Sequence, residues 1–135
     1  MTSLIVDASV AVKWFAAEVN ADKARELGDA GNELIAPELV IAEVGNALWK
    51  KCTRGALGVD QAIASMVRLP TLFDQLFPAS PLGARAIEIS VMMGHPIYDC
   101  FYLALAERER LPIVTFDAKL MIAAKRLGTV ESRNL

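Results

Sequence analysis

Residues 3–10, SLIVDASV, decide the fold of this 135-residue chain, because a short apolar run there ends in a carboxylate. Residues 3–6 are predicted to form a buried strand, Asp7 stands at its end, and a helix is expected over 8–15. The stretch 111–117, LPIVTFD, repeats this pattern, with Asp117 ahead of a helix over 119–127. Apolar strands that lead into helices indicate an α/β fold with a mostly parallel sheet.

The intervening sequence supplies further short elements of the same kinds. We expect helices over 22–27, 37–55, 59–69, 82–93 and 99–110, and a strand over 34–36. Pro37 suits the first turn of a helix, where its missing N–H is not needed. Residues 70–81 hold at most a short aromatic strand. No repeat or linker interrupts the pattern, so residues 1–135 are expected to form a single domain.

Composition narrows the functional classes. Hydrophobic residues make up 54% of the chain and the mean hydropathy is +0.36, which excludes disorder. The net charge of −2 argues against a protein that holds nucleic acid by electrostatics alone. Cys52 and Cys100 lie far apart and are expected to be reduced thiols. Neither a signal peptide nor a run of about 18 apolar residues is present, so a cytoplasmic protein without membrane contact is expected.

Two aspartates occupy places where an α/β sheet binds ligands, outside the carboxyl ends of its strands, and a third lies at the head of a helix. Asp7 and Asp117 follow strands directly, and Asp99 stands at the head of the apolar helix CFYLALA. Aspartate is also a favoured helix N-cap, and each of the three could serve as a cap alone.

Glu43 is a fourth candidate, because it lies in mid-helix between Ala42 and Val44. Helical spacing places Glu43, Asn46 and Lys50 on one stripe. The stripe could be a solvated face or the edge of a site.

Carboxylates that converge repel one another unless a cation compensates them. Mg²⁺ and Mn²⁺ prefer carboxylate and water oxygens, and such ions activate water for phosphodiester hydrolysis. Other chemistries lack their residues. His95 is the one histidine and is expected in an exposed loop, Ser9 lacks the nucleophile-elbow motif, and no glycine-rich phosphate loop is present.

The motifs LIVDASV, PELVIAEVGNAL, YDCFYLALAE and VTFDAKL, in this order, resemble the PIN-domain family, and most closely the VapC-like toxins of bacterial toxin–antitoxin pairs. The resemblance covers nearly the whole chain. It implies a three-layer α/β/α domain around a central, mostly parallel sheet. It also implies a metal-dependent endoribonuclease that uses Mg²⁺, with Mn²⁺ as a substitute.

The same resemblance assigns roles to individual residues. The family's four acids fall on Asp7, Glu43, Asp99 and Asp117. Asp7 and Asp99 are expected to hold the principal metal, while Glu43 and Asp117 complete a second site or bind through water. The expected supporting residues are Ser9, Asn46 and Thr115. The chain departs from the family pattern at Cys100, where alanine is usual, and at Phe116, which is bulkier than usual. RNA products with a 5′-phosphate and a 3′-hydroxyl are expected.

The partners implied by the resemblance are an RNA substrate, with transfer RNA as one candidate, a small antitoxin and a second copy of the chain in a homodimer. The basic residues expected to contact RNA phosphates are Lys13, Lys50, Lys51 and Lys119. An antitoxin could cover Trp14, Phe15 and Trp49, although these side chains could equally belong to the core.

Two other classes of function use similar residues. A haloacid-dehalogenase-type phosphatase needs D-x-D at its first strand, where this chain has Ser9 in place of the second acid. A receiver domain needs an acidic pair that VDASV does not supply. A binding module without turnover, which keeps the metal and the RNA but cleaves nothing, remains the main alternative.

Overall fold

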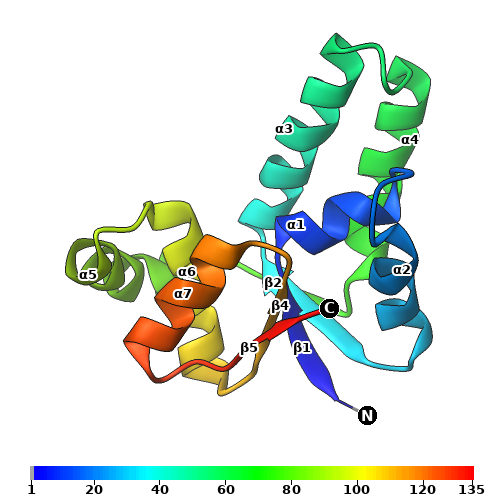
Figure 1. Cartoon of the computed structure of the whole chain (residues 1–135). Helices are drawn as coiled ribbons and strands as arrows, with labels where there is room; N and C mark the ends of the chain where they lie inside the picture. The colour runs from blue at the N-terminus through cyan, green and yellow to red at the C-terminus, as the bar shows by residue number, and fades with distance from the viewer. Residues whose placement is uncertain (1) are drawn as a thin grey trace.

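The structure is a computed structural model that describes residues 2–135, and its centre is a five-stranded parallel sheet (Figure 1). The strands follow the order β3-β2-β1-β4-β5, and every neighbouring pair is parallel. Their bounds are β1 Ser3–Val6, β2 Glu33–Pro37, β3 Gln75–Phe77, β4 Ile113–Thr115 and β5 Ser132–Asn134. The predicted α/β fold with a mostly parallel sheet is confirmed.

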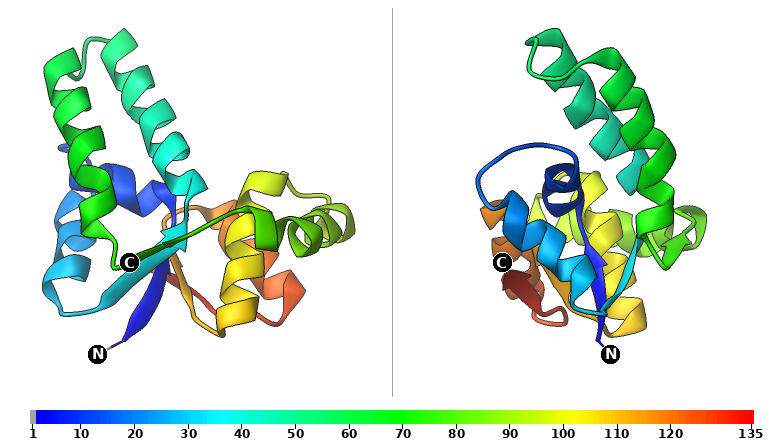
Figure 2. Two further views of the ribbon diagram at one scale, coloured as in Figure 1. Left: turned by 180° about the vertical axis from the view of Figure 1, so that it is seen from behind. Right: turned by 90° about the vertical axis from the view of Figure 1, so that its right-hand side faces the viewer.

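Seven α-helices of the described chain flank this sheet. They are α1 Ala8–Ala11, α2 Ala21–Asp29, α3 Leu39–Thr53, α4 Val59–Arg68, α5 Gly83–Met93, α6 Ile97–Glu109 and α7 Ala118–Leu127. Short 3₁₀ turns, η1 Val12–Trp14, η2 Leu69–Leu72 and η3 Ser80–Leu82, extend some of them. Helices α5, α6 and α7 lie on one side of the sheet and α1 and α2 on the other, which confirms the three-layer arrangement (Figures 1 and 2). Helices α3 and α4 form a hairpin that projects from the sheet.

The connections reverse direction at β1. The chain adds β2 and β3 on one side of β1 and then returns to place β4 and β5 on the other. In parallel sheets such a reversal opens a crevice at the carboxyl ends of the two strands beside it. Those ends belong to β1 and β4, the strands that Asp7 and Asp117 follow.

The core explains the apolar composition. Ile5, Val6, Ile113 and Val114 are fully or almost fully buried, because helices cover both faces of the central strands. Helix α6 packs against strands β2 and β4 and against α5, and it buries every residue from Tyr102 to Ala106. Cys100 is buried and Cys52 is half-buried, and both are free thiols. Within residues 2–135, none of the helices combines the length and the apolar character that crossing a bilayer would require.

Several local expectations were wrong. Pro37 ends β2 instead of opening a helix, and α3 starts at Leu39. Pro37 has no N–H to donate, but the N–H of the next residue, Glu38, donates to the Phe77 carbonyl at 2.7 Å. The pairing of β2 with β3 therefore tolerates a proline at the end of the strand. The first helix is shorter than expected, because α1 gives way to the 3₁₀ turn η1 after Ala11.

Strand β5 was not predicted, because its three residues, Ser-Arg-Asn, are polar and carry no apolar pattern. It exists through backbone pairing with β4 at the edge of the sheet.

Candidate active site

Asp7 is the most buried acid of the site, with 5% of its surface exposed. It caps α1 by accepting the N–H of Val10 at 3.2 Å, as the N-cap interpretation requires. Its Oδ1 also accepts the hydroxyl of Ser9 at 2.7 Å, and its Oδ2 accepts that of Thr115 at 2.6 Å. Burial raises the pKa of Asp7 to about 6, against the opposing effect of these hydrogen bonds, and the charge of Asp99 raises it further.

Two hydroxyls connect the ends of β1 and β4. Ser9 Oγ accepts the N–H of Phe116 at 2.9 Å, and Thr115 Oγ1 accepts the N–H of Asp117 at 2.9 Å. Both hydroxyls donate to Asp7, so these two predicted supporting residues contact a predicted site acid directly. Asp117 itself caps α7 through the N–H of Lys119 at 2.9 Å. Its connection to the other acids therefore runs through Thr115.

Glu43 projects from α3 toward α6. The hydroxyl of Tyr102, a residue that is 1% exposed, donates to Glu43 Oε1 at 2.7 Å. Burial raises the pKa of Glu43 to about 7, and the charges of Asp99 and Asp7 add to this rise, while the Tyr102 hydrogen bond opposes it. Glu43 is thus half-buried among acids, whereas Asn46 on the same stripe is exposed.

Asp99 lies in the first turn of α6 and does not cap it, because the helix begins two residues earlier, at Ile97. Its Oδ2 lies 2.6 Å from Nε2 of His95. Only 13% of the His95 side chain is exposed, so the expectation of an exposed loop residue was wrong.

The structure therefore brings Asp7, Glu43 and Asp99 close enough for the charge of Asp99 to raise the pKa values of Asp7 and Glu43, and for the charge of Asp7 to raise that of Glu43. In the described part of the chain, no lysine or arginine forms an ion pair with these acids or with Asp117. A group of buried and half-buried carboxylates without a lysine or arginine partner has the donor chemistry that Mg²⁺ or Mn²⁺ requires.

The same side chains do not form a closed cage. Across residues 2–135, no three histidine, cysteine or acidic side chains lie near enough together to hold an ion by themselves. Mg²⁺ is commonly bound through one or two carboxylates, with waters and substrate phosphates as its other ligands. The residues at this edge of the sheet fit that mode of binding.

The four predicted RNA-contacting lysines differ in their surroundings. Lys13 pairs with Glu18 at 3.0 Å, and Lys51 pairs with the same carboxylate. Lys50 and Lys119 are exposed and form no ion pair with any described residue. Of the four lysines, only Lys50 and Lys119 therefore have no ion-pair partner among the described residues.

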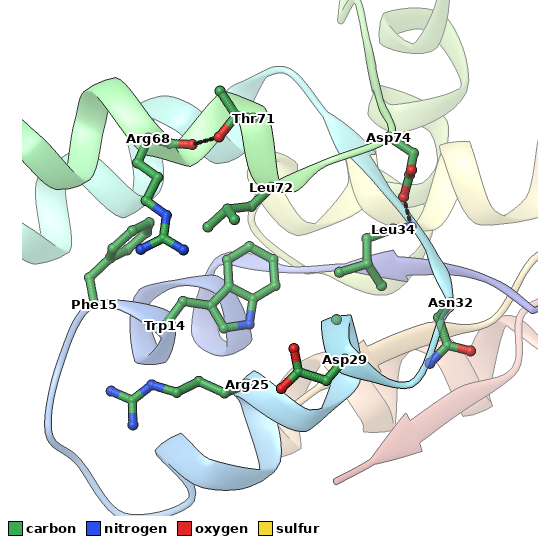
Figure 3. A pocket seen from close by; sticks show the side chains of 11 residues that line it. Trp14, Phe15, Arg25, Asp29, Asn32, Leu34, Arg68, Thr71, Leu72 and Asp74 are labelled. Carbon is green, nitrogen blue, oxygen red and sulfur yellow. Dashed lines mark hydrogen bonds between the residues drawn. The ribbon is translucent and has the colours of Figure 1, made fainter.

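A cavity of about 510 Å³ lies apart from the acids (Figure 3). Trp14 and Phe15 form part of its wall, and Arg25 and Arg68 lie at its sides. The Trp14 indole N–H donates to the Ala24 carbonyl at 2.8 Å, so this ring is anchored as well as half-buried. None of the four acids lines the cavity, whereas Trp49 on α3 is 60% exposed elsewhere.

Sequence reasoning missed two residues of the site. Tyr102 follows Asp99 by three positions, a spacing that places both side chains on one side of the helix, and His95 lies in the loop just before that helix. This periodicity around Asp99 was the available signal. It was masked because Tyr102 belongs to an apolar run and His95 lies before the expected start of the helix.

Comparison with known proteins shows what the sequence and the fold of this chain are similar to. The family model of the PIN domain matches residues 4–126. Ribonuclease VapC1 of Mycobacterium tuberculosis is 38% identical over 90 residues, which cover 65% of this chain and 65% of that relative. Ribonuclease VapC3 of Pyrobaculum aerophilum is 31% identical over 119 residues, which cover 87% of this chain and 91% of that relative. The match to VapC1 thus spans less than two thirds of that protein's length.

Solved structures share the fold. PAE2754 from Pyrobaculum aerophilum has a TM-score of 0.73 and 26% identity, over 97% of this chain and 83% of its own. VapC20 of Mycobacterium tuberculosis, a sarcin–ricin loop cleaving toxin, has a TM-score of 0.73 and 20% identity, over 96% of this chain and 98% of its own. VapBC2 from Rickettsia felis, bound to a DNA fragment from its promoter, has a TM-score of 0.69 and 13% identity, over 99% of both chains.

Proposed function

This chain belongs to the PIN-domain family, and we propose that it is a VapC-type endoribonuclease, the toxin of a toxin–antitoxin pair that acts in the cytoplasm. The observation that carries the proposal is the group of three acids at the carboxyl edge of the sheet. Asp7, Glu43 and Asp99 come from distant parts of the chain, their charges interact, and none of them forms an ion pair with a lysine or arginine among residues 2–135. Such an arrangement destabilises the protein unless it serves a cation.

In this proposal Asp7 and Asp99 hold Mg²⁺ or Mn²⁺, while Glu43 and Asp117 bind a second ion or act through water. When bound, such an ion lowers the pKa of a water molecule and stabilises negative charge on the leaving oxygen. The hydroxyls of Ser9 and Thr115 hold both oxygens of Asp7 in place, so this carboxylate needs little rearrangement on binding.

Glu43 is suited to move the proton of the attacking water. Burial, with the charges of Asp99 and Asp7, raises the pKa of Glu43 to about 7, so its carboxylate accepts a proton more readily than an ordinary glutamate does. The Tyr102 hydroxyl occupies Oε1, which leaves Oε2 to accept that proton. Attack by water predicts a 5′-phosphate and a 3′-hydroxyl at the cut. A 2′,3′-cyclic phosphate would contradict this mechanism.

The surface around the acids suits an RNA backbone in part. Lys50 and Lys119 are exposed and form no ion pair within residues 2–135, so both are proposed to contact phosphates. Lys13 and Lys51 already share Glu18 and would contribute less. Transfer RNA is the first structured RNA to test.

We propose a small antitoxin as the protein partner, and a homodimer as the state of the toxin. Solved neighbours that include toxin–antitoxin complexes support the first of these. The exposed Trp49 is an apolar side chain that an antitoxin would cover. The cavity beside Trp14 and Phe15 would offer an antitoxin both aromatic and charged side chains, because Arg25 and Arg68 also line it.

The decisive experiment incubates purified protein with structured RNA and Mg²⁺ or Mn²⁺, beside two variants prepared identically, each with and without EDTA. Asp99→Asn removes a proposed ligand, and Asp60→Asn makes the same change at an exposed position in the first turn of α4. Cleavage by wild type and Asp60→Asn, lost with EDTA and in Asp99→Asn, is the expected result. Equal cleavage in all samples indicates a contaminating nuclease, and binding of RNA without cleavage indicates the silent module.

A further inference from the structure

His95 has a backbone that is fixed on both sides. Gly94 ends α5 in the left-handed conformation, with φ of 61°, and turns the chain toward α6. The N–H of His95 then donates to the Ser90 carbonyl at 3.2 Å, and its own carbonyl accepts the Ser90 hydroxyl at 2.6 Å. Pro96 follows directly as the N-cap residue of α6. The short loop therefore presents the imidazole in one place.

That place is against Asp99. The distance of 2.6 Å between His95 Nε2 and Asp99 Oδ2 is at the short end for hydrogen bonds to charged groups. An ionised carboxylate offers acceptors only, so the imidazole donates from Nε2. Only 13% of the His95 side chain and 25% of that of Asp99 are exposed, so water competes little for the contact.

The other two acids of the group are held in a comparable way. Ser9 and Thr115 donate to Asp7, and Tyr102 donates to Glu43. His95 is the one side-chain hydrogen-bond partner that Asp99 has among residues 2–135. Without it, no side-chain hydrogen bond within the described residues would hold Asp99 in one orientation.

We propose that His95 is a positioning residue for the divalent cation, acting through Asp99. It holds Oδ2 and leaves Oδ1 to the ion, so that the carboxylate does not have to be ordered when the ion binds. The proposal rests on the metal site of the proposed function. It goes beyond that function because it assigns a role to a residue that is neither an acid nor a ligand. Partners of ligating carboxylates typically change metal affinity by roughly 10–100-fold when they are removed.

The test measures Mn²⁺ binding to the RNA-free protein by calorimetry at one fixed pH. His95→Leu keeps an apolar side chain of similar size without a donor, and His95→Gln keeps an N–H at a similar reach. Thr129→Val is the matched control, because Thr129 donates to Glu107 at 2.7 Å, a hydrogen bond to another carboxylate of α6 far from the site. We expect roughly 10–100-fold weaker binding for His95→Leu, binding within about threefold of wild type for His95→Gln, and no change for Thr129→Val.

A double variant separates positioning from general packing. If His95 acts through Asp99, His95→Leu has no further effect on Mn²⁺ affinity in an Asp99→Asn background. Additive losses would overturn the proposal, as would wild-type affinity in His95→Leu or a His95→Gln protein as weak as His95→Leu. Thermal unfolding of each variant verifies that it is folded.

The same samples keep this inference distinct from the proposed function. A wild-type protein that binds Mn²⁺ but cleaves no RNA refutes the ribonuclease and leaves the role of His95 standing. A wild-type protein that binds no Mn²⁺ overturns both.

Discussion

Replacement of Asp7 by asparagine is expected to make the protein more stable while it removes a metal ligand. Burial raises the pKa of Asp7 from its ordinary value of 3.8 to about 6. At about 1.4 kcal/mol per pKa unit, keeping this group ionised in the folded protein costs about 3 kcal/mol at pH 7.5. Asparagine removes that cost but weakens one of the hydroxyl contacts, which is worth about 1 kcal/mol. The net gain is therefore about 2 kcal/mol.

The sign of the pH dependence follows from the direction of the shift. Between pH 3.8 and about 6 the folded state holds a proton on Asp7 that the unfolded state has released. Wild-type stability therefore falls as pH rises through this window, and the full penalty is present above it. Asp7→Asn lacks this term. We expect the two proteins to be nearly equal at pH 4.5 and to differ most above pH 6.

Urea unfolding in EDTA, followed by circular dichroism at several pH values, measures this difference. With a slope near 2 kcal/mol per molar urea, the midpoint of Asp7→Asn should lie about 1 M higher at pH 7.5. Asp117→Asn is the control, because asparagine caps a helix about as well as aspartate, and a change below about 1 kcal/mol is expected there. An Asp7→Asn protein that is less stable than wild type at pH 7.5, or a gap that does not depend on pH, would refute the reasoning.

Other perturbations probe the site and its support. Tyr102→Phe removes the hydrogen bond that opposes the pKa rise of Glu43, so the rising limb of the cleavage rate against pH should move to higher pH. Tyr98→Phe, a change at a 64% exposed position, should leave the profile in place. An unmoved limb in Tyr102→Phe would contradict the proposed role of Glu43. Mg²⁺ at about 100 times its Kd should raise the free energy of unfolding of the wild type by about 2.7 kcal/mol, and that of Asp99→Asn far less. Urea unfolding measures both values, and an equal increase in the two proteins would place the ion elsewhere. Trp14→Phe removes the indole N–H that donates to a carbonyl of α2, so the free energy of unfolding should fall by about 1–3 kcal/mol. An unchanged urea midpoint would count against the anchoring of this ring.

Much of the fold was predictable because its central strands are apolar and its helices keep their period. The strands that precede Asp7 and Asp117 could be recognised from their buried residues alone. Strand β5 could not be recognised, because a polar edge strand is held by backbone hydrogen bonds that no side-chain pattern records. Pro37 misled because a proline suits the first turn of a helix as well as the end of a strand.

The candidate acids could be found from their positions after strands and in the family motifs. The side chains that surround these acids could not be found in the same way. The contact of His95 with Asp99 depends on where α6 begins, and helix boundaries shift by a residue or two without a clear signal. The hydrogen bond from Tyr102 to Glu43 joins helices that lie far apart in the chain, so it required the packed structure.

The pairing of β1 with β4 also has a consequence for biosynthesis. The hydrogen bond from Thr115 to Asp7 joins residues 108 positions apart, near the two ends of the chain. Contacts of such long range form slowly and only after both segments are available. A nascent chain that lacks β4 cannot form this hydrogen bond. Asp7 therefore gains its Thr115 donor only after residues 113–115 have been made and have paired with β1, so the proposed metal site reaches its final form late in folding.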